Sequence, residues 1–186
     1  MAKIGDPPDN PRPGNDRQAA NLGQAAPLAA DSGGGRTNSA ILGEIVWLML
    51  QAPLYRKWSL AGLERYVLPA IHHRQFRIYH RGDIPIGYVS WAKFNKTVEE
   101  KYITGTYALT PEDWVSGDNV WIIDCLAPYG DINSVRMHMR KERPFGGTGM
   151  VKGIRPFRDG EGQRIVEFGP YPKRKKHGWS MRVVNR

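Results

Sequence analysis

Cysteine is almost absent from this chain, because Cys125 is the only one in 186 residues. One thiol excludes an intrachain disulfide framework and is typical of proteins in a reducing compartment. Long apolar runs are missing as well, since Gly43 and Glu44 interrupt the longest one, around residues 41–50. A membrane span needs about 20 apolar residues and a signal peptide needs an apolar N-terminal stretch, so neither is expected. We therefore expect a cytoplasmic protein.

Large aliphatic side chains are scarce in residues 1–38, which contain only Ile4, Leu22 and Leu28 beyond Met1. A segment rich in Pro, Gly, Asn, Asp and Ala cannot bury enough apolar surface to offset the entropy of folding. The whole chain is 40% hydrophobic, and its length allows one sizeable core. We expect a disordered N-terminal arm over residues 1–38, one folded domain over residues 39–170 and a basic C-terminal tail over residues 171–186.

Acidic residues are scarce in the last quarter of the chain. Residues 1–135 hold 13 Lys and Arg against 14 Asp and Glu, whereas residues 136–186 hold 14 against 4. A basic surface of this kind attracts nucleic acid, an acidic membrane or an acidic protein. The run Lys173-Arg174-Lys175-Lys176-His177 is also compatible with a solvated, frayed tail. No nucleic-acid-binding motif is recognisable, so nucleic acid is not the expected partner.

Apolar periodicity and capping residues predict a mixture of helices and strands. One helix should follow a cap at Asn38 or Ser39, and another should start at Ser59 and be kinked or ended by Pro69. The turn residues 82–85 predict a hairpin. Further predicted elements are a helix from Asn95 or Thr97 to Ile103, a short helix at 110–113, a helix capped by Asp131 that runs to about Glu142, and strands at 150–157 and 164–168. This order indicates an α+β fold.

A single carboxylate, Asp124, lies in the middle of an apolar run of strand length, residues 120–127. Strands covered on both faces are apolar throughout, and a lone charge in one of them loses hydration worth several kcal/mol. We therefore expect the pKa of Asp124 to be raised, or its charge to be paired. The residues alone leave open whether this carboxylate is catalytic or is satisfied by backbone amides or an arginine at a strand end.

The run Trp121-Ile-Ile-Asp124-Cys-Leu-Ala-Pro128-Tyr-Gly130-Asp131 resembles W-F-I-D-W-x-A-P-F-G-D, a signature of the toxin-activating lysine-acyltransferases, the hemolysin-activating family. Other segments resemble that family's motifs in the same order, namely residues 47–58, residues 67–71 followed by Gln75 and Phe76, residues 85–91, and residues 112–118. The resemblance spans residues 41 to about 143. Several ordered blocks are more specific than any one short motif.

The resemblance implies an N-acetyltransferase-like mixed sheet flanked by helices. It also implies transfer of a fatty acyl group from acyl carrier protein to internal lysines of an RTX protoxin, with no permanently bound cofactor. The N-acetyltransferase pyrophosphate loop, R/Q-x-x-G-x-G/A between a strand and a helix, is missing. Residues 143–148 match it only partly, and they lie between a helix and a strand, where their amides would not crown a helix N-terminus. This favours acyl carrier protein, whose acidic surface suits the basic last quarter, over free acyl-coenzyme A.

Acyl transfer to lysine needs a proton acceptor, because a lysine of pKa about 10.4 is almost wholly protonated at neutral pH. In the family this chemistry is assigned to a histidine and the strand aspartate, and the aspartate corresponds to Asp124. The family's Ser-Pro-Leu-His is Ala52-Pro53-Leu54-Tyr55 in this chain. A phenol of pKa about 10 is a poor base, so Tyr55 either donates a hydrogen bond to the oxyanion or fills the histidine's space. Asp124 and Tyr55 are the predicted catalytic-site residues.

Two functional alternatives follow from the altered motif. The chain is either an acyltransferase, with activity reduced by Tyr55, or a catalytically impaired relative that binds the carrier or the toxin without turnover. The sequence does not determine the oligomeric state, and a homodimer is left open.

The other titratable residues offer no obvious substitute for the missing histidine. None of His72, His73, His80 and His138 occupies the motif position. Strand alternation places Cys125 on the opposite face from Asp124, which predicts a buried, inert thiol. The spacing of His and Cys matches no metal site, so no metal is expected.

Overall fold

The computed structural model describes residues 27–146, 149–156, 163–169 and 180–184. Its strands are β1 (Leu28–Asp31), β2 (Phe76–Arg81), β3 (Ile84–Phe94), β4 (Asn119–Leu126), β5 (Val151–Pro156), β6 (Gln163–Gly169) and β7 (Ser180–Val184). Its helices are α2 (Asn38–Gln51), α3 (Leu60–Tyr66), α4 (Leu68–His72), α5 (Lys96–Ile103), the 3-10 helix η1 (Glu112–Val115) and α6 (Ile132–Glu142). The strands form one sheet in sequence order, in which only β4 and β5 are parallel. The predicted α+β, N-acetyltransferase-like mixed sheet is confirmed.

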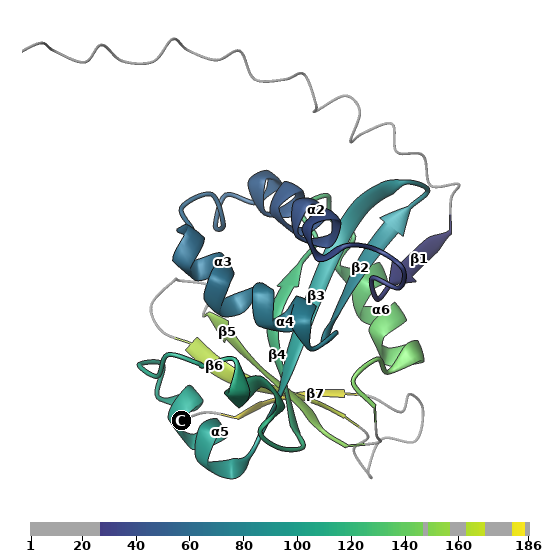
Figure 1. The fold of residues 1–186 in the computed structure, drawn as a ribbon. Coiled ribbons are helices and arrows are strands. Elements are labelled where there is room, and N and C mark those ends of the chain that lie inside the picture. The colour runs from purple at the N-terminus through teal and green to yellow at the C-terminus, as the bar shows by residue number, and fades with distance from the viewer. Residues whose placement is uncertain (1–26, 147–148, 157–162, 170–179, 185–186) are drawn as a thin grey trace, which may run out of the picture.

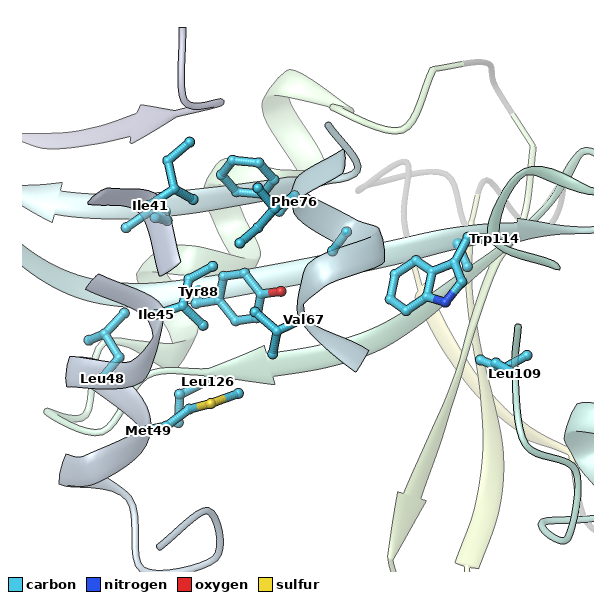
Figure 2. Packing of buried hydrophobic residues seen from close by; sticks show 14 of the residues in the cluster. Ile41, Ile45, Leu48, Met49, Val67, Phe76, Tyr88, Leu109, Trp114 and Leu126 are labelled. Atoms are coloured by element: carbon cyan, nitrogen blue, oxygen red, sulfur yellow. The ribbon is translucent and has the colours of Figure 1, made fainter. Parts of the chain in front are cut away.

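Helices cover both faces of the sheet (Figure 1). On one face α2 and α4 enclose the main core, where Tyr88 of β3 lies among Ile45, Val67 and Leu126 (Figure 2). On the other face α6 packs through Val135. Burial of apolar area on both faces provides the main stabilisation of such a layered fold.

The first helix forms where helical spacing predicts it. Its buried residues Ile41, Ile45 and Leu48 recur every three or four positions. The cap, however, is Thr37, whose hydroxyl accepts a hydrogen bond from the Ala40 amide at 3.2 Å, so the expected cap at Asn38 or Ser39 is displaced by one or two residues.

The predicted second helix is two helices. Ser59 caps α3 as expected, and its hydroxyl accepts from the Gly62 amide at 3.2 Å. The break lies at Val67, with φ −110°, and Pro69 then occupies the first turn of α4. Proline fits there because its missing N–H has no helical partner in a first turn.

Of four remaining local expectations, two are confirmed and two are not. The hairpin of β2 and β3 and the cap of α5 by Asn95 are confirmed, the latter with a 2.8 Å bond from the Val98 amide. Residues 110–113 lead into the short 3-10 helix η1 and not an α-helix. Asp131 begins α6 but makes no side-chain cap, because its carboxylate accepts from Arg81 Nη2 at 2.5 Å.

Both ends of the fold extend further than expected. Residues 28–31, assigned to the disordered arm, form β1 and pair with β2. Residues 180–184, assigned to the basic tail, form β7 and pair with β6. Residues 1–26 of the predicted arm and the basic run 173–177 lie outside the described residues.

The parallel strands β4 and β5 pair over a short stretch only. Val120, Trp121 and Ile122 face Val151, Lys152 and Gly153. Glu99 of α5 holds this paired end together, since it accepts from Trp121 Nε1 at 2.8 Å and from Lys152 Nζ at 2.5 Å. Beyond Ile122 the strands continue without pairing to each other. The divergence opens space between them.

Gly117 is required by close backbone packing. A Cβ at this position would lie 2.5 Å from the Asn95 nitrogen and 2.6 Å from the Phe94 carbonyl oxygen. We expect Gly117→Ala to lower the free energy of unfolding by about 1–3 kcal/mol, the usual range for overpacking, in a urea titration followed by circular dichroism. Gly34→Ala is the control, since a Cβ at Gly34 meets nothing within 4 Å. Equal stability of the two variants would contradict the packing argument.

Candidate active site

A cavity of about 700 Å³ lies where β4 and β5 diverge. Its wall on β4 comprises residues 122–125, and α6 contributes one side. Leu54 and Tyr55 line it from the turn that follows α2. The remaining lining is largely apolar and comes from β5, β6 and the segment after α6, with Phe145, Val151, Gly153, Ile154, Val166 and Phe168. Such a cavity can hold an alkyl chain.

Asp124 is the buried carboxylate of this cavity, with 8% of its surface exposed. Its Oδ1 accepts hydrogen bonds from the Tyr55 hydroxyl and from the Cys125 amide, the latter at 2.9 Å. Its Oδ2 is buried and has no hydrogen-bond partner within the described part of the chain. Burial raises the pKa of Asp124 to about 6, against the lowering effect of the two donors. The expected rise in pKa is therefore present, and no described arginine pairs with this carboxylate.

Tyr55 reaches Asp124 because the chain turns sharply after α2. Proline at position 53 disfavours helix at the residue before it, and the Tyr55 amide then bonds to the Ala52 carbonyl at 3.0 Å. The ring packs against Trp58, with centroids 5.2 Å apart. Burial, followed by the charge of Asp124, raises the pKa of Tyr55 far above its usual value. The phenol stays protonated at neutral pH and acts as a donor to Asp124.

Ser90 is a polar neighbour of the site that the sequence did not single out. It faces Asp124 in the register of β3 and β4, and it is fully buried. Its hydroxyl makes no well-formed hydrogen bond to a described residue. Only strand pairing brings the two side chains together, so no sequence pattern could have identified it.

None of the described histidines lines the cavity. His80 contacts Glu44 at 3.0 Å. His138, on α6, packs against the ring of Tyr79 on β2. His73 contacts the Pro111 carbonyl at 3.2 Å, while His72 is exposed. The structure therefore brings Asp124 and Tyr55 together and leaves these histidines apart from them.

Cys125 packs on the α6 side of the sheet with Val135 and Val89, as strand alternation predicts. Burial raises the pKa of its thiol to about 11. A thiol that remains protonated at neutral pH is a weak nucleophile. Among the described residues, no group of three or more His, Cys, Asp or Glu side chains is arranged to hold a metal ion.

These features define a class: an α+β protein of acetyltransferase-like architecture whose cavity meets a buried carboxylate. Residues 35–169 match the model of the RTX toxin acyltransferase family. This match covers most of the chain, and the chain belongs to that family. No described helix is both long enough and apolar enough to cross a membrane.

Three relatives illustrate the similarity. The RTX-I toxin-activating lysine-acyltransferase of Actinobacillus pleuropneumoniae is 40% identical over 128 residues, 69% of this chain and 73% of the relative. The RTX-III toxin-activating lysine-acyltransferase of the same organism is 42% identical over 103 residues, 55% of this chain and 60% of the relative. The protein-lysine myristoyltransferase of Escherichia coli is 41% identical over 104 residues, 56% and 61% of the two chains. The matched region thus spans about three fifths of the latter two relatives.

Proposed function

We propose that the protein transfers a fatty acyl group from acyl carrier protein to lysine side chains of an RTX-type protoxin in the cytoplasm, and so activates the toxin. The relatives' names describe lysine acyltransferases, two of them toxin-activating. The observation that carries the proposal is the buried Asp124 in the wall of the cavity. Its Oδ2 accepts no hydrogen bond from a described residue.

The reaction requires a proton acceptor at this position. The lysine nitrogen attacks the thioester carbonyl carbon, an amide bond forms, and the carbon–sulfur bond breaks. The ammonium loses two protons on the way to the amide: Asp124 accepts them in turn, one is then passed to the leaving thiolate and the other is released to solvent. At pH 7 a carboxyl of pKa about 6 is mostly ionised, so it can attract the ammonium before it accepts the proton.

The pKa values must approach each other for this transfer to be fast. The pKa of lysine in water is about 10.4 and that of Asp124 in the protein is about 6, and this difference corresponds to a free energy of about 6 kcal/mol. Entry into the cavity removes the ammonium from water. Desolvation lowers the pKa of a lysine, so the difference between the two pKa values narrows on binding.

Tyr55 is assigned a positioning role. Its neutral hydroxyl donates to Asp124 Oδ1 and leaves Oδ2 available for the lysine. The hydrogen bond also lowers the pKa of Asp124, which keeps the carboxylate ionised at neutral pH. This role replaces the phenolate base, which the raised pKa of Tyr55 disfavours.

The start of α6 supports acyl carrier protein as the donor in preference to acyl-coenzyme A. The connection from β4 to α6 places Asp131 at the helix N-terminus, paired with Arg81. A carboxylate there would repel a pyrophosphate. Residues 143–148 partly match the pyrophosphate loop of N-acetyltransferases. Within them, Arg143 and Gly146 follow the C-terminus of α6 with positive φ values, so their amides do not lie at a helix N-terminus.

The proposal is tested by incubating the purified protein with a protoxin and an acyl donor, followed by intact-protein mass spectrometry. We expect the protoxin to gain the mass of one fatty acyl group per modified lysine with acyl carrier protein as donor, and no gain with acyl-coenzyme A. No mass gain from either donor would contradict acyl transfer.

The raised pKa of Tyr55 favours a second function. Tyr55 stands where the family has its histidine, and its phenol cannot serve as a base near pH 7. A catalytically impaired protein would bind the carrier or the toxin without turnover. Stable binding in a pull-down assay, together with unchanged protoxin mass, would support this alternative.

A further inference from the structure

Four arginines line one part of the cavity. Arg136 and Arg140 lie one turn apart on α6, while Arg155 of β5 and Arg164 of β6 face each other across the strand pair. This grouping, defined here as the arginine cluster, was not expected from the sequence.

The arginine cluster is electrostatically unfavourable when empty. Like charges at i and i+4 of a helix, or directly opposite in a strand pair, destabilise a protein. The ion pairs formed between described residues include none of the four. Burial, together with the nearby charges of Arg136 and Arg164, lowers the pKa of Arg155. Arg164 Nε is buried without a hydrogen-bond partner among described residues.

An anion would relieve this arrangement. Guanidinium groups bind phosphate oxygens through paired, charge-assisted hydrogen bonds, and a planar fork suits a phosphate better than a point charge does. Apolar residues of the same cavity, such as Ile122, Ile154 and Phe168, suit an alkyl chain. The expected ligand therefore combines an apolar chain with one phosphate group.

We propose that the arginine cluster binds the phosphate of the donor's phosphopantetheine arm, while the attached acyl thioester extends through the cavity toward Asp124. This inference rests on the proposed function. The thioester and the alkyl chain carry no charge, so the phosphate is the anion that this part of the donor can present. The site is distinct from the N-terminus of α6, where Asp131 would repel it.

The test uses two soluble donors, acyl-4′-phosphopantetheine and acyl-pantetheine, which differ only in the phosphate. Isothermal titration should show that the wild-type protein binds the phosphorylated compound about 10-fold to 100-fold more tightly, as two or more charge-assisted bonds would give. The double variant Arg155→Gln, Arg164→Gln should bind the two compounds with nearly equal affinity. Arg136→Gln, on the helix side of the cavity, should reduce the preference as well.

Arg65→Gln is the matched control, because Arg65 lies on α3 and does not line the cavity. Inorganic phosphate gives a second measurement, since it should raise the melting temperature of the wild type and of the control but not that of the double variant. Equal wild-type affinity for the two donors, or no binding of either, would overturn the proposal. Binding is measured without protoxin, so this failure is separate from a failure of acyl transfer in the mass assay.

Discussion

Asp124→Asn is expected to abolish acylation of the protoxin while leaving the fold intact. Asparagine is nearly the same size and keeps an oxygen for the Tyr55 hydroxyl and the Cys125 amide. It cannot accept the proton of the attacking lysine, and general-base catalysis is typically worth about 10²–10⁴-fold. The rate of protoxin mass gain should fall by at least that factor.

Asp124→Asn should lose activity without losing stability. The pKa of Asp124 rises from 3.8 to about 6 on folding, so ionisation above pH 6 opposes folding by about 3 kcal/mol. The corresponding stability is present below pH 4, where the carboxyl is protonated in both states, and is lost as the pH rises through 6, where the ionisation penalty is complete. Asparagine avoids it but buries an amide N–H, which costs about 1–3 kcal/mol if unpaired. The free energy of unfolding at pH 8 should therefore be unchanged or slightly higher.

The control for this prediction is Asp83→Asn, which makes the same chemical change in the exposed turn between β2 and β3. It should retain full acylation. If Asp124→Asn acylates normally, the site assignment is wrong. If it unfolds, Asp124 is chiefly a structural residue.

Tyr55→Phe is expected to shift the pH dependence of acylation toward alkaline pH. Removal of the hydroxyl deprives Asp124 of a charge-assisted hydrogen bond worth about 1.5–3 kcal/mol, which corresponds to about one to two pKa units. At pH 7 more of the carboxyl is then protonated and the rate falls about 2-fold to 10-fold, whereas at pH 9 most of the rate returns. A purely structural role would lower the rate equally at both pH values.

Two further variants sharpen the test of Tyr55. Tyr55→His introduces the histidine that the resemblance to the family implies at this position, and it should preserve or raise the rate at pH 7. Tyr107→Phe removes another tyrosine–aspartate bond, the 3.0 Å contact to Asp113, away from the cavity, and it should leave the pH dependence unchanged. A shift in the control as large as that of Tyr55→Phe would contradict the specific role.

The carboxylate of the site was predictable because its signal is local. One charge in an apolar strand stands out in a single sequence, and physical chemistry alone predicts its raised pKa. Tyr55 lies 69 positions away in the sequence, and only the ordered family motifs assigned it to the same site as Asp124; the hydrogen bond between the two was not predicted. The direction of the bond, from the phenol to the carboxylate, required the three-dimensional arrangement.

The arginine cluster was missed although its charge was counted. The positive excess of the last quarter was interpreted as a basic surface for an acidic partner or, at residues 173–177, as a frayed tail, because a charge count does not say which side chains face a cavity. Arg155 and Arg164 become neighbours only through the antiparallel register of β5 and β6. Their relation to Arg136 further depends on the side of the sheet that α6 covers.

The two edge strands were missed for a related reason. β1 has four residues and β7 has five, and each forms by pairing with a neighbour distant from it in the sequence or separated by a long connection. Strands this short contain too few residues to show a clear alternation of apolar and polar side chains or a strong strand propensity. Composition therefore favoured an arm and a tail where the chain adds strands to the sheet.

The most direct test of Asp124 as proton acceptor is the pH dependence of kcat/KM for protoxin acylation by the wild-type protein between pH 5 and 8. The rate should rise with pH and reach half its maximum near pH 6, since the carboxylate must be ionised to accept the proton of lysine. A rate that is constant over this range, or one that falls as the pH rises through 6, would contradict a catalytic carboxylate at this position.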